Sequence, residues 1–100
     1  MNEQLISPIP FSVPEDKRID MSLAITTINN HLVDGFFDFD MSNGKINFQL
    51  TASYIESILG KNLFDYMLNV SAITVDEYNE KFLLISKGII TLEQFIDSGL

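Results

Sequence analysis

The dipeptide Asn43-Gly44, set between two segments of alternating apolar and polar residues, restricts the fold of this chain more than any other feature. Asn-Gly is the preferred sequence for a two-residue type I′ turn, because both central positions of that turn need positive φ. Such a turn pairs Met41 with Ile46, Phe39 with Phe48, Phe37 with Leu50, Asp40 with Asn47 and Asp38 with Gln49. The pattern therefore predicts a β-hairpin with one apolar and one polar face, since a slip by one residue would exchange the faces.

The residues before this hairpin predict an extended arm followed by a helix. We expect residues 1–13 to form an arm or an edge strand, because their two prolines lack ladder donors and keep their predecessors extended. Pro14 suits the first turn of a helix, and Gly35 is its expected end. The apolar positions of that helix recur on one face and are Met21, Ile25, Ile28 and Leu32. Residues 14–100 are then one α+β domain.

The segment that follows the hairpin predicts a longer second strand and three helices. The strand is expected to continue through Ala52 and Tyr54, in preference to a helix that starts at Ser53 with Glu56 as its capping partner. The first of the three helices has a stripe of Leu63, Phe64, Met67, Leu68 and Ser71.

Two capping signals divide the remaining residues. Thr74 and Glu77 form a capping box with Ile73 and Tyr78 as a hydrophobic staple, which predicts the start of a new helix with Tyr78, Phe82 and Ile85 on one face. Gly88 ends it, and Thr91 with Gln94 predicts a last short helix. The expected fold class is α+β, with an antiparallel hairpin or small sheet packed against helices. Two strands alone are marginal in water, so either the arm adds a strand or another molecule does.

Composition and charge exclude several classes of protein. The net charge is −8, with Asp and Glu spread along the chain, which disfavours nucleic acid and anionic membranes as partners. No segment approaches the roughly 20 apolar residues of a membrane span, and the first ten residues lack the pattern of a signal peptide. The absence of Cys excludes disulfides and fits the cytosol. We therefore expect a cytoplasmic domain that binds neither nucleic acid nor membrane.

The sequence offers no combination of residues typical of an active site. The segment from Asp38 resembles the start of a calcium loop, but an EF-hand needs Gly at position 6 and Glu at position 12, where this chain has Asn43 and Gln49. His31 is the only histidine, so a transition-metal site is not expected. The five glycines are scattered singly and form no phosphate loop. We expect no enzyme, no metal and no cofactor.

Several short motifs occur in the same order as in the YbjN-like bacterial domains. They are residues 10–15 (PFSVPE), 28–29 (IN), 35–40 (GFFDFD), 43–48 (NGKINF), 74–78 (TVDEY) and 88–95 (GIITLEQF). The chain resembles this family over about residues 8–97. The resemblance implies a fold like that of type III secretion chaperones, a role described as sensory-transduction or stress regulation, and no catalytic residues. Full domains of the family have a further helix and strands before the Pro-Phe segment, which implies that this chain is a shortened relative or that a partner supplies them.

These features together predict a non-enzymatic protein-binding module, chaperone-like or regulatory, that acts as a homodimer through its sheet or its Phe-rich face. The candidate partner-binding residues are Asp34, Phe36, Asp38, Asp40, Phe64 and Tyr78. The stripe of Phe and Met side chains is either core or a binding groove, and the usual burial of these residues favours core. An alternative is a small acidic inhibitor of the phage anti-defence type, whose Asp34, Asp38 and Asp40 would block a basic nucleic-acid-binding groove of a target protein.

Overall fold

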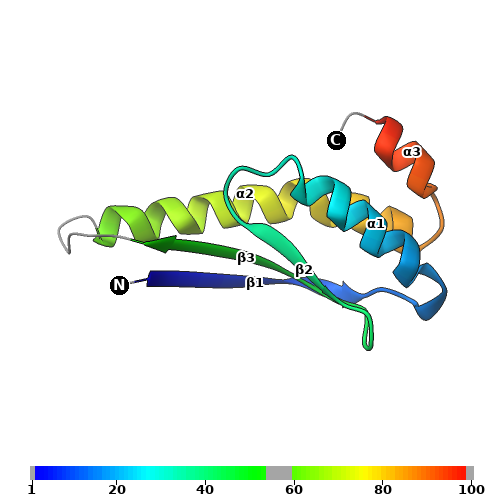
Figure 1. Cartoon of the computed structure of the whole chain (residues 1–100), viewed down its shortest axis with the longest axis horizontal. Helices are drawn as coiled ribbons and strands as arrows, with labels where there is room; N and C mark the ends of the chain where they lie inside the picture. The colour runs from blue at the N-terminus through cyan, green and yellow to red at the C-terminus, as the bar shows by residue number, and fades with distance from the viewer. Residues whose placement is uncertain (1, 54–59, 99–100) are drawn as a thin grey trace.

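The computed structural model describes the backbone of residues 2–53 and 60–98, and the side chains of residues 4–50 and 65–98. Its elements are β1 (Asn2–Ser12), the 3-10 turn η1 (Glu15–Lys17), α1 (Arg18–Asn29), β2 (Phe36–Asp40), β3 (Lys45–Ser53), α2 (Gly60–Ser86) and α3 (Leu92–Asp97) (Figure 1). The three strands form one antiparallel sheet with helices packed against it, which confirms the expected α+β class.

The arm supplies the third strand of the sheet. The strand order is β1-β3-β2, so β3 lies in the centre and β1 pairs with it in antiparallel direction. The ladder is regular from Asn2 to Pro8 and is interrupted by a bulge before Ser12. Prolines are confined to edges and bulges of sheets because they have no N–H to donate, and Pro8 and Pro10 occupy such positions. The sequence left open whether the arm or another molecule adds a strand to the hairpin, and the structure shows that the arm does so.

The predicted register of the hairpin is wrong by two residues. Phe37 pairs with Phe48, Asp38 with Asn47, Phe39 with Ile46 and Asp40 with Lys45, so the connection contains the four residues 41–44. A shift by two residues keeps the direction of every side chain, because the period of a strand is two. The apolar face is therefore as predicted for Phe37, Ile46, Phe48 and Leu50, whereas Met41 leaves the strand and is half-exposed.

Local side-chain hydrogen bonds favour the longer loop. The Asp40 carboxylate accepts hydrogen bonds from the Ser42 N–H at 2.8 Å and the Ser42 hydroxyl at 2.6 Å. The Asn43 amide oxygen accepts the Lys45 N–H at 2.9 Å, and the Gly44 N–H donates to the Asp40 carbonyl at 2.8 Å. Asp, Ser and Asn stabilise turns through such bonds. In a two-residue turn these side-chain and backbone groups would lose their hydrogen bonds within the loop and would bind water instead.

Helix α1 ends earlier than predicted. Its buried face is the expected one, with Met21, Ile25 and Ile28 inside, but the helix stops at Asn29 rather than at Gly35. Gly35 does have a positive φ, of 78°, but it uses that conformation to enter β2. A Cβ at this position would lie 2.6 Å from the Gln49 carbonyl oxygen, so the glycine permits close approach of the chain to β3.

The predicted helix boundary at Thr74 is wrong, because α2 is one helix of 27 residues. Among its described side chains, the buried ones are Met67, Ser71, Tyr78, Phe82, Ile85 and Ser86. This buried face packs on the sheet, and tertiary packing of an apolar face outweighs a local capping signal. Leu68, expected in the same stripe, is 43% exposed.

Other predictions in this region are confirmed or fall outside the described residues. The second strand extends to Ser53 and so includes Ala52, as preferred over a helix. Tyr54 and Glu56 lie outside the described residues, as do the side chains of Leu63 and Phe64.

The two remaining helix ends match the sequence signals. Gly88 has φ of 71°, and Ile89 N–H donates to the Leu84 carbonyl at 2.9 Å, which is the pattern of a Schellman cap. Thr91 and Gln94 form the predicted capping box, with the Gln94 N–H donating to Thr91 Oγ1 at 3.1 Å and the Thr91 N–H to Gln94 Oε1 at 2.9 Å.

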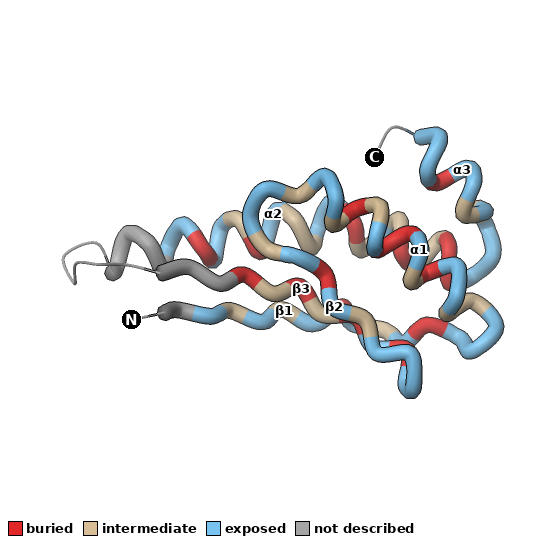
Figure 2. Tube along the Cα trace, in the orientation of Figure 1, coloured by how far each residue is buried: buried red, intermediate tan, exposed pale blue. Residues whose placement is uncertain are grey.

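The core lies between the sheet and the helices, where buried positions of both face each other (Figure 2). Phe37 is at the centre of an aromatic cluster, with ring centroids 5.1 Å from Phe48, 5.0 Å from Phe82 and 5.7 Å from Tyr78. Edge-to-face and tilted contacts of this kind stabilise beyond their buried area. The interpretation of the Phe and Met stripe as core therefore holds for Met67, Tyr78 and Phe82.

Candidate functional site: the open face of the sheet

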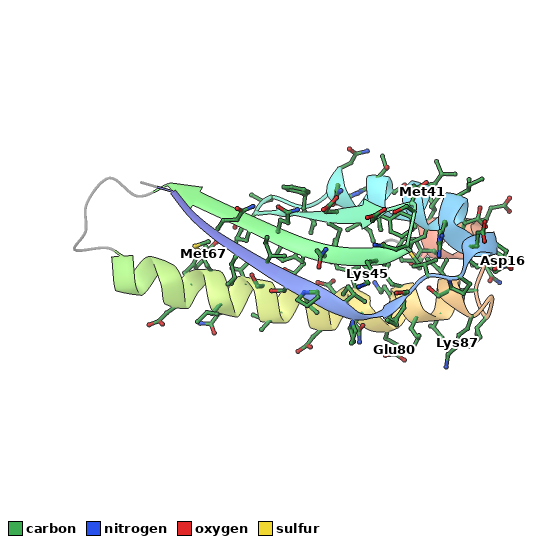
Figure 3. The ribbon with its side chains drawn as sticks, turned by 90° about the horizontal axis from the view of Figure 1, so that it is seen from below. Asp16, Met41, Lys45, Met67, Glu80 and Lys87 are labelled. Atoms are coloured by element: carbon green, nitrogen blue, oxygen red, sulfur yellow. The ribbon has the colours of Figure 1, made fainter. Side chains whose placement is uncertain are left out.

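Helices α1 and α2 pack on the same side of the sheet, and no described helix covers its other side (Figure 3). We call this side the open face. Its residues are Gln4, Ile6, Pro8 and Ser12 from β1, Lys45, Asn47 and Gln49 from β3, and Phe36, Asp38 and Asp40 from β2. Antiparallel sheets commonly have one solvated face with polar side chains. The apolar residues among these positions are therefore the informative ones.

Ile6 and Phe36 form an apolar pair on either side of Gln49. Both are the directly opposite partners of Gln49, from β1 and β2 respectively, so the three residues make one row across the sheet. Ile6 is 53% exposed and Phe36 is 45% exposed. Directly opposite residues in an antiparallel sheet lie about 5 Å apart. The row is thus a small exposed apolar surface with an amide in its middle.

The Gln49 amide is held by hydrogen bonds to both outer strands. Gln4 Nε2 donates to Gln49 Oε1 at 2.9 Å, and Gln49 Nε2 donates to Asp38 Oδ2 at 3.1 Å. These exposed bonds contribute little to stability, since each competes with water. They orient the Gln49 side chain between Ile6 and Phe36.

The open face becomes charged toward the hairpin loop. The next rows are Pro8–Asn47–Asp38 and Ser12–Lys45–Asp40. Hydrogen bonds from the Ser42 hydroxyl and N–H lower the pKa of Asp40, with a smaller contribution from the Arg18 guanidinium. Asp40 is therefore ionised at neutral pH.

Arg18, the first residue of α1, forms hydrogen bonds to the hairpin loop at the charged end of the open face. Its Nε donates to the Val13 carbonyl at 3.1 Å, and its Nη1 donates to the Met41 and Ser42 carbonyls at 3.2 and 3.3 Å. The Val13 N–H in turn donates to the Gly44 carbonyl at 2.8 Å. The loop is thus held by residues that are far from it in the sequence.

The substitution Asp40→Asn is expected to lower the melting temperature at pH 7 and to have little effect in acid. Because the pKa of Asp40 is lower in the folded than in the unfolded chain, its ionised form stabilises the fold above the unfolded pKa, and this contribution is lost as pH falls through the folded pKa. Thermal unfolding of both proteins at pH 7 and well below pH 3.8 checks this. Asp38→Asn is the matched control, and a difference for Asp40→Asn that persists in acid would contradict the assignment.

The predicted site residues are distributed over several parts of the structure. Phe36, Asp38 and Asp40 lie together on the open face. Asp34 lies in the connection before β2, where its carboxylate accepts the Tyr66 hydroxyl at 2.7 Å, and this bond raises the pKa of Tyr66. Tyr78 is 4% exposed and belongs to the core, so its side chain is not available to a partner.

The sequence predicts Phe64 as a site residue but not Ile6 and Gln49 of the open face. The Phe64 side chain lies outside the described residues. Sequence reasoning missed Ile6 and Gln49 as site residues, because Leu5 and Ile6 are adjacent and both apolar, so alternation alone does not say which one faces the core. Gln4, Ile6 and Pro8 are spaced by two residues and therefore lie on one face of a strand. The polar Gln4 and the proline at position 8 are the signal that would have placed Ile6 on the solvent-exposed face.

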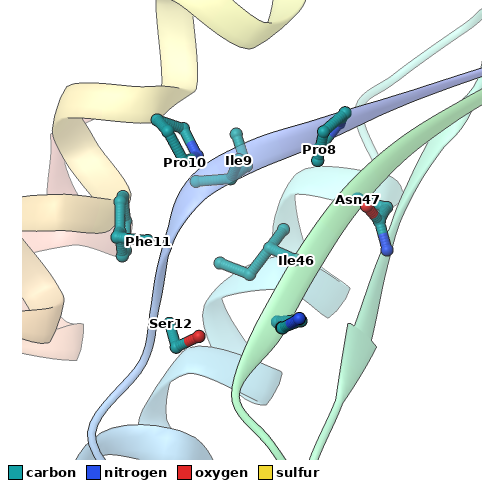
Figure 4. A pocket seen from close by; sticks show the side chains of 8 residues that line it. Pro8, Ile9, Pro10, Phe11, Ser12, Ile46 and Asn47 are labelled. Atoms are coloured by element: carbon teal, nitrogen blue, oxygen red, sulfur yellow. The ribbon is translucent and has the colours of Figure 1, made fainter.

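A hollow of about 250 Å³ lies where the bulge separates β1 from β3 (Figure 4). Its lining comes from residues 8–12 and 45–47, with Ser12, Lys45 and Asn47 as the polar members. Small-molecule sites are typically about 300–1,000 Å³ and enclose their ligand. The hollow is smaller than such sites, and its lining includes Pro8, Lys45 and Asn47 of the open face.

Metal-binding and membrane-spanning features are absent from the described residues. No group of three or more His, Asp or Glu side chains lies close enough to bind a metal ion within that part of the chain. His31 is exposed, with Nδ1 2.9 Å from the Thr27 carbonyl. No helix in the described ranges is both long and apolar enough to cross a bilayer.

Comparison with known proteins gives no relative for this chain. No family model, no curated protein and no solved structure matches it. The open face therefore has to be interpreted from its own chemistry.

Proposed function

We propose that this chain is a non-enzymatic protein-binding module, chaperone-like or regulatory, that forms a homodimer through the open face of its sheet. The observation that carries the proposal is the row Ile6–Gln49–Phe36, in which two large apolar side chains remain half-exposed on a face that no described helix covers. The motifs that resemble YbjN-like domains support the same class of function. A cytoplasmic location, which the absence of Cys fits, is part of the proposal.

The chemistry of the open face suits a self-complementary contact. Apolar side chains at the centre of an interface, surrounded by polar groups that exclude water, provide most of the binding energy. Ile6 and Phe36 occupy the apolar end, while Lys45, Asp38 and Asp40 lie toward the other end. In a two-fold contact each patch meets its own copy. A two-fold axis parallel to the strands would place each row over the same row of the other copy, so that Ile6 faces Phe36 and Lys45 of each copy lies toward Asp40 of the other.

The charge of the chain gives this proposal a distinctive salt dependence. Two copies with a net charge of −8 repel each other, and added salt screens that repulsion. Homodimerisation through an apolar row should therefore strengthen as salt rises. Binding to a basic partner should weaken under the same change.

Sedimentation velocity at micromolar concentration tests the dimer, which is expected at twice the chain mass of 11.3 kDa. The double substitution Ile6→Lys with Phe36→Lys should raise the dimer Kd by roughly thirtyfold or more, since loss of an interface hot spot costs at least ~2 kcal/mol. Ile19→Lys is the matched control, because Ile19 is 69% exposed on α1 and lies outside the open face. A parent protein that remains a monomer at these concentrations would refute the dimer.

The acidic inhibitor remains a second proposal, favoured by one observation. Asp38 and Asp40 are both exposed on the same strand face, and Asp34 is exposed shortly before that strand. Binding to a basic nucleic-acid-binding protein should then weaken with salt and be abolished by Asp38→Lys with Asp40→Lys. Unchanged binding of that variant would contradict the inhibitor proposal and leave the dimer proposal standing.

A further inference from the structure

The outer edge of β2 is occupied by a side chain at the position where another strand would pair. Phe37 N–H donates to Asn29 Oδ1 at 2.8 Å, and Asn29 Nδ2 donates to the Phe37 carbonyl at 2.9 Å. A side-chain amide has one acceptor and donors in the same plane, as a peptide group does. Asn29 therefore gives Phe37 the same pair of hydrogen bonds that a neighbouring β-strand would give.

These two bonds also establish which backbone groups point away from the sheet. The N–H and C=O of one residue in an antiparallel ladder point to the same side. Both groups of Phe37 bind Asn29, so they point away from β3 and toward the open edge of β2. Phe39 has the same parity and the same outward direction, and within the described residues no side chain bonds its backbone.

The same alternation places Pro8 at the opposite edge. Phe48 is the partner of Phe37, so its backbone groups point toward β1, where they meet Ser7. Pro8 is the next residue, and its nitrogen therefore faces the outer edge of β1, where it offers no donor. An unpaired edge is a template for association, and proline is one of the residues by which proteins block it. Each edge of the sheet thus carries one blocking residue.

We propose that Asn29 keeps the β2 edge closed, and that without its amide β2 pairs edge to edge with β2 of a second copy of this chain. The occupant is a second copy because an antiparallel pair of identical strands satisfies the outward groups of Phe37 in both. Asp38 and Asp40 oppose this pairing only through like charge, which salt screens. Asn29 is the group that competes directly for the hydrogen bonds.

This inference does not rest on the open-face dimer, and the experiment separates the two. Asn29→Ala and the control Asn30→Ala are each made in the background that carries both Ile6→Lys and Phe36→Lys, in which open-face association is expected to be weakened. Asn30 is the neighbouring residue, is exposed, and has no side-chain bond to β2 in the described structure. Sedimentation velocity is run over a hundredfold range of concentration at high salt, with far-UV circular dichroism to check the fold.

The expected result is a mass that rises with concentration to at least twice the monomer for Asn29→Ala and a constant mass for Asn30→Ala. A folded Asn29→Ala protein with a constant monomer mass would overturn the inference. If the Asn29→Ala protein does not fold, hydrogen exchange of the backbone amides in the parent protein tests the same inference. There, the Phe37 N–H should exchange at least tenfold more slowly than the Phe39 N–H, and equal rates for the two would show that Asn29 does not close the edge.

Discussion

Replacing Phe37 with alanine is expected to lower the free energy of unfolding by about 4 kcal/mol, within the range for buried Phe→Ala substitutions. Phe37 is buried and its ring contacts the rings of Phe48, Tyr78 and Phe82, so the substitution removes a ring that contacts both the sheet and α2. The cavity would lie between the sheet and α2, where a continuous helix has little freedom to collapse inward. Chemical denaturation followed by circular dichroism measures the loss.

The adjacent residue provides a matched control for this prediction. Phe36→Ala is the same chemical change one position away, on the open face. As a monomer, the Phe36→Ala protein should lose less than ~1 kcal/mol, because its side chain is already half in water. Similar losses for the two substitutions would mean that the assignment of faces in β2 is wrong.

The second large effect is expected at Gly44, where alanine should cost roughly 3 kcal/mol or more. The φ of Gly44 is 75°, a conformation that costs other residues about 1–2 kcal/mol. A Cβ would in addition lie 2.3 Å from the Val13 carbonyl oxygen, and relief of that clash requires the backbone to move, at a further ~1–3 kcal/mol. The movement would also strain the bond between Val13 N–H and the Gly44 carbonyl.

The substitution Gly88→Ala separates the cost of the positive φ from the cost of the Cβ clash. Its φ of 71° is nearly the same, but a Cβ there would lie 3.5 Å from the nearest atoms, which belong to the Lys17 side chain. Gly88→Ala should therefore cost only ~1 kcal/mol, from the backbone conformation alone. The difference between the two alanine variants in urea denaturation measures the close approach of the hairpin loop to Val13. Equal losses would contradict that contact.

The sequence predicted those parts of the fold that depend on near neighbours. The alternation in residues 36–40 and 45–50 gave the correct faces, and the capping box of Thr91 and Gln94 gave the correct start of α3. The loop length was missed because Asn43-Gly44 favours a two-residue turn, whereas Asp40 and Arg18 hold a four-residue one. The break at Thr74 was missed because a local capping signal is weaker than a stripe packed on a sheet.

The candidate site could be predicted only in part, for a related reason. Phe36, Asp38 and Asp40 were identified from the alternation of one strand. The row Ile6–Gln49–Phe36 depends on the pairing of β1 with β3, which joins distant parts of the sequence. Tyr78 has the composition of an interface residue, but the position of α2 over the sheet places it in the core.

The strand order has a consequence for the order in which the chain can fold. Gln4 and Gln49 are hydrogen-bonded across β1 and β3 yet lie 45 residues apart, whereas β2 and β3 are joined by a short loop. Contacts between distant residues form late, because a long loop must close first. The segment of β1 emerges from the ribosome before its partner strand exists, and it must remain unpaired until β3 follows. Pro8 and Pro10 have no N–H to donate, so they limit the pairing of the unpaired β1 segment with other strands. The prolines at the edge of the folded sheet therefore also disfavour wrong strand pairing in the nascent chain.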